Sequence, residues 1–499
     1  MSRPVPAIVV TVPARSVVEA RSQIAEARAA GADLVEVRLD RFPEDELRRL
    51  DALFPSPVRL LATLRSRAEG GEGPDRSEER ARRLGEFARF PFRWIDAELE
   101  RDFPAAESLA RPGVLDLVVS SHFVTEVSAA AWATAVRQRV PKGCVRKVVT
   151  RASVGHLLRE LLPRLPPPEE APLVALTTGG SGPLLRAWSG RLGFALVFAS
   201  PPEPREGPAR PPVEPSQIPI DRLKPFLEAE GTPPLFAITG HPVAHSRSPG
   251  IFARWMREDE RIGLYVALDF ESDTEFTDAV PLLAQGGFRG LSVTHPYKAV
   301  AAELADEVGP GAAACGVANT LTFGPNGVAS ENTDLVAILR RLGELRSSGT
   351  WDGMSVGVIG AGGAARATLA ATRSLGVESY VWARRGEAAE QLAREFGAHA
   401  ASGSRDDRPS LVVHATPVGR ASDAVPVPPD LSWLRSGVPV VDWVYAPDLP
   451  TIRHASERVG APYEDGARLL VYQAAASYGL WWGNEPDPEQ VSATIREFR

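Results

Sequence analysis

The first half of the chain alternates short apolar, β-rich runs with longer segments of helical periodicity. Each of the first seven runs is followed by a segment that can hold a helix, such as Ser16–Ala30 and Glu126–Arg139. Eight β/α units in about 220 residues predict a (β/α)8 barrel, with an open doubly wound sheet as the alternative. The runs are A-I-V-V-T-V, D-L-V-E-V-R-L-D, V-R-L-L-A-T-L-R, W-I-D-A-E-L-E, L-D-L-V-V-S-S-H, R-K-V-V-T-R, P-L-V-A-L-T-T and F-A-L-V-F-A.

The same alternation begins again after a proline-rich stretch that ends near Gly231. The runs P-L-F-A-I-T-G, L-Y-V-A-L-D-F and G-L-S-V-T predict strands of a second α/β domain, and a helical pattern follows Asp334. From Ser355 the chain reads as strand, glycine turn and helix, followed by further strands, which is typical of a Rossmann-like fold. We therefore expect a barrel over 1–225, a substrate-binding domain over 232–345 and 468–499, and a dinucleotide-binding domain over 346–467.

Composition narrows the class of protein. Lysine and arginine number 56 against 63 acidic residues, so the net charge of −7 gives no general attraction to nucleic acids or anionic lipids. Cys144 and Cys315 follow no disulfide or zinc spacing, and we expect a reducing, cytoplasmic setting and no metal. The start of the chain has no signal-peptide pattern, and no run of about 18 apolar residues occurs, so we expect neither export nor membrane insertion. The oligomeric state stays open.

Polar residues at the carboxyl ends of the predicted barrel strands are the first candidates for chemistry, because barrel enzymes place their sites there. Three arginines around one mouth predict an anionic substrate with a carboxylate, because the guanidinium fork pairs with carboxylates in a bidentate way. Lys147 lies in a strand with apolar neighbours, where desolvation favours a neutral amine that can attack a carbonyl, and His122 can then move a proton. Lys142 lies in the loop before that strand. The candidates are Glu36, Arg38, Arg65, His122, Lys147 and Arg186.

The motifs E-V-R, T-L-R-S-R-A-E-G-G, S-S-H and R-K-V-V-T, in this order, resemble the type I 3-dehydroquinate dehydratases over about residues 5–220. The resemblance implies that Lys147 forms an imine with 3-dehydroquinate, that His122 shuttles protons and that Glu69 orients His122. It also implies substrate contacts from Glu36, Arg38, Arg65, Arg186 and Gln217. The chain departs from the family at Leu185 and Val213, where serines are usual, and in the insertion Pro201–Pro212, all near the closing loop.

The glycine motif G-A-G-G-A-A, Gly360 to Ala365, predicts a dinucleotide site. It follows an apolar strand and opens a helix, so backbone amides can approach a pyrophosphate. The next strand ends at Ala383 without an acidic residue for a ribose 2′-hydroxyl, and two arginines follow, which favours NADP. The residues concerned are Gly360, Ala361, Gly362, Gly363, Ala364, Arg384 and Arg385.

Upstream of this motif, a lysine and an aspartate can handle the proton that accompanies hydride transfer to a ketone. They are Lys298 in V-T-H-P-Y-K and Asp334 in E-N-T-D. His241 and His245 have the spacing of a metal-ligand pair, but Pro242 and the lack of a third ligand argue against zinc.

These segments, with H-A-T-P-V-G, V-D-W-V-Y-A-P and L-L-V-Y-Q, resemble shikimate dehydrogenase over nearly all of residues 234–485. The resemblance makes Lys298 and Asp334 the catalytic pair. The departures are Leu335, Ala383 and His414, where the family usually has glycine, asparagine and asparagine. The implied substrate contacts are Ser246, Ser248, Thr294, Asn319 and Gln473, and the implied cofactor contacts, besides the glycine turn, are Arg384, Thr416 and Tyr445.

The implied product of the first half, 3-dehydroshikimate, is the implied substrate of the second. The order of the two halves resembles bifunctional dehydratase–dehydrogenase fusions of the shikimate pathway. Two alternatives stay open: a quinate-directed dehydrogenase fused to the dehydratase, and a non-catalytic metabolite sensor descended from such a fusion. Transfer of the intermediate between the sites also stays open.

Overall fold

The structure is a computed structural model that describes residues 5–103, 105–168, 170, 172–204, 212–401, 408–416, 433–445 and 451–497. Its first sheet has the strand order β7-β6-β5-β4-β3-β2-β1-β8, and the successive pairs are parallel. The amide of Ala195 donates to the carbonyl of Leu173 at 2.9 Å and brings the two ends of the sheet together, so the predicted barrel is confirmed and the open sheet is wrong. The strands are β1 (Ala7–Val12), β2 (Leu34–Arg38), β3 (Arg59–Thr63), β4 (Trp94–Glu98), β5 (Asp116–Glu126), β6 (Val145–Arg151), β7 (Leu173–Thr178) and β8 (Leu196–Ala199).

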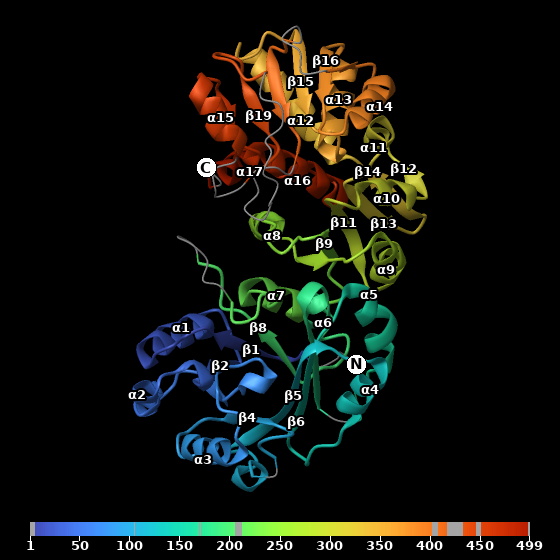
Figure 1. The fold of residues 1–499 in the computed structure, drawn as a ribbon. Coiled ribbons are helices and arrows are strands. Elements are labelled where there is room, and N and C mark those ends of the chain that lie inside the picture. The colour runs from blue at the N-terminus through green and yellow to red at the C-terminus, as the bar shows by residue number, and fades with distance from the viewer. Residues whose placement is uncertain are drawn as a thin grey trace. The chain divides into compact units, whose positions relative to one another are not determined.

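The helices between these strands begin and end close to where the sequence predicts them (Figure 1). The segment Glu126–Arg139 does hold a helix, α4, which begins at Ala129 because β5 continues along β6 as far as Glu126 through an irregular register. His122 therefore lies within β5 and not at its end. The helices are α1 (Val17–Ala29), α2 (Glu44–Leu47), α3 (Ser77–Phe87), α4 (Ala129–Arg137), α5 (Val154–His156), α6 (Gly182–Ala187) and α7 (Ile220–Glu228).

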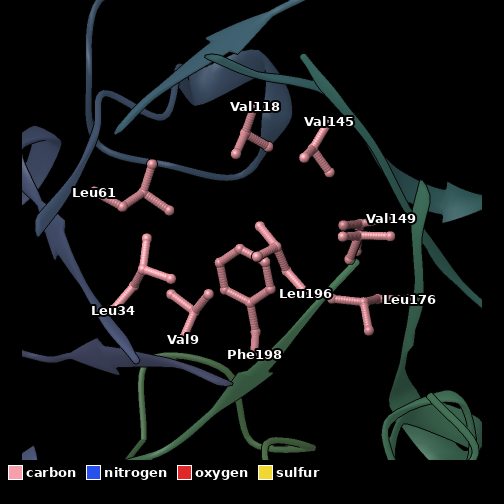
Figure 2. Close-up of a cluster of buried hydrophobic side chains, with 10 residues drawn as sticks. Val9, Leu34, Leu61, Val118, Val145, Val149, Leu176, Leu196 and Phe198 are labelled. Atoms are coloured by element: carbon pink, nitrogen blue, oxygen red, sulfur yellow. The ribbon is translucent and has the colours of Figure 1, made fainter. Parts of the chain in front are cut away.

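The inside of the barrel is a packed apolar core and not a channel. Alternate residues of the strands point inward, as the twofold period of a strand requires. Figure 2 shows the side chains converging on the centre, where the ring of Phe198 lies. Phe198 is 2% exposed, and its ring closes the core on the side of the candidate site described below. The core cluster comprises Val9, Leu34, Leu61, Val118, Val145, Val149, Val174, Leu176, Leu196 and Phe198.

The second sheet is mixed and has the order β10-β9-β11-β13-β14-β12. Its antiparallel hairpin of β13 and β14 was not predicted from the sequence. The strands are β9 (Leu235–Gly240), β10 (Leu264–Asp269), β11 (Phe288–Val293), β12 (Glu307–Val308), β13 (Thr320–Gly324) and β14 (Gly327–Glu331). The helices of this region are α8 (Ser248–Glu258), α9 (Asp273–Gln285), α10 (Lys298–Glu303), α11 (Pro310–Cys315) and α12 (Thr333–Ser347).

The third sheet is parallel and has the order β17-β16-β15-β18-β19-β20. Numbered from its own first strand this is 3-2-1-4-5-6, the strand order of a dinucleotide-binding fold, which confirms the predicted Rossmann-like domain. Its strands are β15 (Ser355–Ile359), β16 (Glu378–Trp382), β17 (His399–Ala400), β18 (Leu411–His414), β19 (Val440–Asp442) and β20 (Tyr463–Glu464). Helices α13 (Gly363–Leu375), α14 (Gly386–Phe396), α15 (Thr451–Val459), α16 (Ala467–Trp482) and α17 (Pro488–Glu497) complete the chain (Figure 1).

Several helices begin at the capping side chains that the sequence supplies. The hydroxyls of Ser16 and Ser128 accept from backbone amides of α1 and α4, and the Asn332 side chain does the same for α12. The longest apolar helix, α16, packs against α12. Among the described residues, no helix has the length and apolar character needed to cross a membrane.

A buried ion pair between Arg80 and Asp102 connects α3 to the loop that follows β4. Arg80 is fully buried, and its Nε and Nη2 each donate to one carboxylate oxygen of Asp102 at 2.8 Å. Nη2 and Nη1 also donate to the carbonyls of Leu64 and Pro74. Such a pair gives little net free energy, but removal of one partner leaves the other charge buried and unpaired.

We expect Arg80→Met to lower the free energy of unfolding by about 3–5 kcal/mol, because Asp102 then stays buried without its partner. The matched control is Arg82→Ala on the same helix, whose pair with Glu86 is largely exposed and whose loss costs less than about 1 kcal/mol. Urea unfolding followed by circular dichroism measures both. Equal losses for the two variants would contradict this role of Arg80.

Candidate active sites

A cavity of about 320 Å³ opens at the carboxyl ends of the barrel strands. Each residue that the sequence assigned to the barrel site lines it, so residues from strands β2, β5 and β6, from helix α6 and from the segments after β3 and before α7 are brought together. They are Glu36, Arg38, Arg65, Glu69, His122, Lys147, Arg186 and Gln217. The position of Val213, where the family usually has serine, is also in the cavity wall.

Lys147 lies on β6 and is 4% exposed. Its Nζ is 3.1 Å from Asp96 Oδ2 and 3.9 Å from Glu36 Oε1, and it lies 3.9 Å above the centre of the Phe198 ring. The prediction that Lys147 has apolar neighbours is therefore correct for Phe198, but it is wrong where Nζ faces the carboxylates of Asp96 and Glu36. The amine is held between an aromatic floor and two acids, which fixes the direction in which Nζ points.

Asp96 on β4 is the main functional residue that the sequence reasoning missed. Burial would raise the pKa of its carboxyl, but the Arg65 guanidinium and the Lys147 ammonium outweigh this effect and lower the pKa to about 2. The carboxylate also accepts a hydrogen bond from the Ser120 hydroxyl at 2.5 Å. Asp96 thus supplies a fixed negative charge beside Nζ. The signal was an acid within the predicted fourth strand, W-I-D-A-E-L-E, whose inward face carries Asp96.

His122 and Glu69 form the pair that the family resemblance implies. Glu69 Oε2 accepts from the His122 backbone amide at 3.0 Å and lies 3.1 Å from His122 Nδ1. Burial, reinforced by the cations of Arg65 and Lys147, holds the pKa of His122 well below its ordinary value. The imidazole is therefore neutral near pH 7. With Nδ1–H facing Glu69, Nε2 is the nitrogen that can accept a proton.

The Glu69 carboxyl titrates near neutrality. Burial raises its pKa to about 7, and the nearby Glu98 carboxylate adds to this, although Arg65 opposes it. Arg65 Nη1 donates to Glu69 Oε2 at 2.9 Å. Near pH 7 a small change in this balance changes the charge on the group that orients His122.

The three arginines of the cavity differ in their protein partners. Arg65 contacts the carboxylates of Glu69, Asp96 and Glu98, and Arg38 forms a two-pronged pair with Asp40 at 2.8 Å. Arg186 meets one acid, Glu214, at 3.2 Å.

Burial lowers the pKa of the Arg186 guanidinium, and Glu214 offsets only part of this effect. Arg186 is therefore the guanidinium whose charge is least compensated, which makes it the best receptor for a carboxylate ligand. Glu214 lies in the loop that carries Gln217, and the sequence reasoning did not single it out. A carboxylate that binds Arg186 meets Glu214 there.

Lys298, Asp334 and Asn319 form the second cluster. Lys298 begins α10, and its Nζ pairs with Asp334 Oδ2, while Asn319 Nδ2 donates to Asp334 Oδ1 at 2.9 Å. Thr333 N donates to Asn319 Oδ1 at 2.7 Å, so the amide orientation of Asn319 is fixed. The cluster presents a cation, a carboxylate and an amide together, as the sequence predicts.

Thr294 lies four residues before Lys298, at the end of β11, and its amide donates to Thr239 O at 2.8 Å. Ser248 N donates to Ser246 Oγ at 3.3 Å where α8 begins, and Gln473 on α16 donates to Leu470 O at 2.8 Å. The contact of Ser246, Ser248 and Gln473 with one ligand stays a prediction.

The glycine turn has the shape that a dinucleotide needs. Gly360 has φ +133°, and a Cβ there would lie 2.5 Å from the carbonyl oxygen of Ala415, so only glycine fits. Gly362 caps α13 and has open space at the position of a Cβ. Gly363 lies against the Lys298 side chain, whose Cδ would be 2.7 Å from a Cβ. Ala361 and Ala364 complete the turn and the first residues of the helix.

Arg384 and Arg385 follow β16 and are exposed, with Arg385 at the start of α14. Thr416 follows β18, and its Cγ2 lies near the glycine turn, 3.2 Å from where a Cβ of Gly360 would be. Tyr445 follows β19. The carboxyl ends of β15, β16, β18 and β19 thus carry the residues that the sequence assigned to the cofactor, at the edge where ligands bind in such sheets. The residues present fit a dinucleotide with a 2′-phosphate.

The two halves define two enzyme modules: a parallel barrel with a buried lysine in its mouth, and a two-lobed α/β unit with a dinucleotide fold. The family model for type I 3-dehydroquinase matches residues 8–233, and that for the shikimate dehydrogenase substrate binding domain matches residues 238–321. The chain belongs to the shikimate dehydrogenase family, and its first half is a type I 3-dehydroquinase barrel.

Two curated relatives support this assignment. The NADP(+)-dependent shikimate dehydrogenase of Dinoroseobacter shibae is 34% identical over 281 residues, which are 53% of this chain and 98% of that protein. That of Methylobacterium radiotolerans is 37% identical over 281 residues, 53% of this chain and 96% of the relative. The structure of dehydroquinate dehydratase and shikimate dehydrogenase from S. pombe AroM is 20% identical with a TM-score of 0.43, covering 99% of this chain and 98% of that one.

We expect the pKa of Glu69 to make the barrel less stable as the pH rises from about 4.5 to about 7. The protonated form is favoured in the folded state, so its contribution is complete below the unfolded pKa and is lost as the pH rises through the folded value. Glu69→Gln mimics the protonated form and removes this loss, which is at most about 3 kcal/mol. Urea midpoints of wild type and variant across this pH range measure it. Parallel curves would contradict the prediction.

Proposed function

We propose that this chain carries out two consecutive reactions. The barrel dehydrates 3-dehydroquinate to 3-dehydroshikimate through an imine on Lys147, and the second half reduces 3-dehydroshikimate to shikimate with NADPH. The observation that carries the proposal is the buried lysine, acid and histidine in one barrel cavity, in a chain that also holds the Lys298–Asp334 pair beside a glycine turn. The product of the first reaction is then the substrate of the second.

In the dehydratase, the Lys147 ammonium first gives up a proton, and its Nζ then attacks the ring ketone. The adduct takes up one proton as it loses water, which leaves a cationic imine. Asp96 stays ionised, so its carboxylate, 3.1 Å from Nζ, compensates this positive charge. Nε2 of His122 removes the proton from the carbon next to the imine.

The same proton then leaves with the tertiary hydroxyl as water. Hydrolysis of the imine frees 3-dehydroshikimate and restores the amine of Lys147. Arg186 binds the substrate carboxylate in this proposal, and Glu36, Arg38, Arg65 and Gln217 surround the ring.

In the dehydrogenase, bound NADPH supplies the hydride for the ketone. Lys298 and Asp334 supply the proton to the developing alkoxide, and the Asn319 amide holds Asp334 in place. Ser246, Ser248, Thr294 and Gln473 bind the ring hydroxyls and the carboxylate. The glycine turn, Thr416 and Tyr445 bind the cofactor, while Arg384 and Arg385 take its 2′-phosphate.

The domain boundaries that we propose are 1–225, 232–345 with 468–499, and 346–467. We also propose a cytoplasmic location, which two unpaired buried cysteines support. Relative turnover of shikimate and quinate distinguishes this assignment from a quinate-directed enzyme. Absence of turnover with tight binding of the intermediates would instead identify a metabolite sensor.

Borohydride reduction in the presence of 3-dehydroquinate is expected to leave a stable secondary amine on Lys147, because it reduces the imine in place. Peptide mass spectrometry locates the adduct, which disappears in Lys147→Ala. The matched control is Lys142→Ala, five residues earlier in the exposed loop, which keeps the adduct. An adduct on Lys142 would overturn the proposed role of Lys147.

Lys298→Met is expected to lower kcat for 3-dehydroshikimate reduction by about 100-fold or more, since a positioned proton donor contributes this much. The methionine keeps an aliphatic stem against Gly363, so the KM for NADPH changes by less than about threefold. Steady-state kinetics separate the two constants. A large rise in KM with kcat unchanged would place Lys298 in cofactor binding instead.

A further inference from the structure

A hydrogen-bonded chain of three side chains lies at the carboxyl ends of β18 and β19. His414 and Asp442 are register partners on these parallel strands, and both are fully buried. Nδ1 of His414 lies 2.8 Å from Asp442 Oδ1, and Nε2 lies 2.6 Å from Thr416 Oγ1. The imidazole therefore connects a buried carboxylate to the hydroxyl of Thr416. The family usually has asparagine at position 414, so this connection comes from a departure of the present sequence.

The direction of these hydrogen bonds follows from the acid end. Asp442 also accepts from the Val444 amide at 2.9 Å and from the Tyr463 hydroxyl at 2.9 Å. Burial and the Asp442 carboxylate raise the pKa of Tyr463, so its hydroxyl keeps its proton and donates it. A carboxylate with these partners accepts from each of them, and His414 consequently carries a proton on Nδ1.

The proton on Nδ1 of His414 also determines which atom donates in the hydrogen bond between His414 Nε2 and Thr416 Oγ1. For the form of His414 that carries a proton on Nδ1 alone, Nε2 is an acceptor, and the Thr416 hydroxyl donates to it. The hydroxyl proton is used in this bond, so Thr416 Oγ1 can only accept from a further partner. Without His414 the hydroxyl can rotate and serve as donor or acceptor.

Thr416 also lies at the place where a dinucleotide passes. Its Cγ2 and the carbonyl of Ala415 pack against Gly360, and Ala415 N donates to Ile359 O at 2.8 Å. The glycine turn follows β15 and Thr416 follows β18, the two strands between which the connections reverse direction in this sheet. Arg384 and Arg385 follow β16 on the other side of the turn. If they take the adenosine 2′-phosphate, the nicotinamide half lies over β18 and β19.

We infer that Asp442 and His414 are positioning residues that hold the Thr416 oxygen as a hydrogen-bond acceptor for a donor of the nicotinamide half, a ribose hydroxyl or the carboxamide N–H. This inference rests on the proposed NADP binding. In this inference, Asp442 and His414 contribute to the affinity for NADPH through Thr416, without contacting the cofactor themselves.

The test is the dissociation constant of NADPH, measured by fluorescence titration on the full chain. Thr416→Val keeps the shape and removes the hydroxyl, and we expect it to raise the constant about fivefold to tenfold, as expected for one hydrogen bond. Thr416→Ser restores the hydroxyl and stays within about twofold of wild type. His414→Asn keeps a donor for Asp442 but is too short to reach Thr416 as well, so the hydroxyl is no longer held as an acceptor; we expect binding to weaken, but less than in Thr416→Val.

The double variant separates a relay from two independent effects. If His414 acts through Thr416, His414→Asn with Thr416→Val binds NADPH no more weakly than Thr416→Val alone. Additive losses would overturn the relay. Nitrogen NMR of the wild-type histidines, with His414→Asn for assignment, must show an unprotonated Nε2 at His414, and a protonated Nε2 would overturn the assigned polarity.

A second probe, 2′,5′-ADP, carries only the adenosine half. We expect Thr416→Val to leave its dissociation constant unchanged, whereas the control Arg384→Ala weakens both 2′,5′-ADP and NADPH. Equal weakening of both probes by Thr416→Val would overturn the assignment to the nicotinamide half. Failure of wild type to bind NADPH would refute the proposed function itself, whereas binding unaffected by Thr416→Val would refute only the relay.

Discussion

The ion-pair network around Arg65 is the interaction on which the barrel site depends. A guanidinium that is 4% exposed can lie in the barrel mouth only because three carboxylates, of Glu69, Asp96 and Glu98, surround it. Its charge in turn helps to keep Asp96 ionised and His122 neutral. One buried cation thus keeps a carboxylate beside the Lys147 amine and a neutral imidazole beside Glu69, whereas burial alone would raise the pKa of Asp96.

The number of acidic partners also distinguishes Arg65, whose charge is compensated by protein carboxylates, from Arg186, which we propose binds the ligand. A buried guanidinium with several protein acids has little left to gain from a further carboxylate. Arg186 meets one acid among the described residues, Glu214, and its other donors go to neutral oxygens of Thr177, Gly182, Phe198 and Ser216. Glu214 lies in the loop segment V-E-P-S-Q, residues 213–217. Its carboxylate contacts the Arg186 guanidinium, to which we propose that a substrate carboxylate binds. If a substrate carboxylate binds Arg186, as we propose, it competes with the carboxylate of Glu214.

Strand positions and motif residues could be predicted from the sequence because they depend on local periodicity and on spacing. The eight barrel strands and the residues of the barrel cavity are of this kind. Asp96 could not be assigned, because its contact with Lys147 depends on β4 and β6 lying on either side of β5 with both side chains pointing inward, a relation that no local pattern contains. His414 was visible as a departure from asparagine, but its partner Asp442 became apparent only from the register of β18 and β19. The hairpin of β13 and β14 was missed, although the short turn from Gly324 to Gly327 carries the glycine signal of a tight hairpin.

The two glycines Gly360 and Gly363 belong to one sequence motif, but the structure requires them for different reasons. Gly360 is required by its backbone, since φ +133° and the carbonyl of Ala415 exclude a side chain. Gly363 is required by a neighbour, since a Cβ there would meet the stem of Lys298. Lysine is flexible, so an added methyl would displace it at little cost in stability, but the displacement would separate Nζ from Asp334. Two glycines of one motif are thus required for different reasons: Gly360 by the conformation of the turn, and Gly363 by the space that the Lys298 side chain occupies.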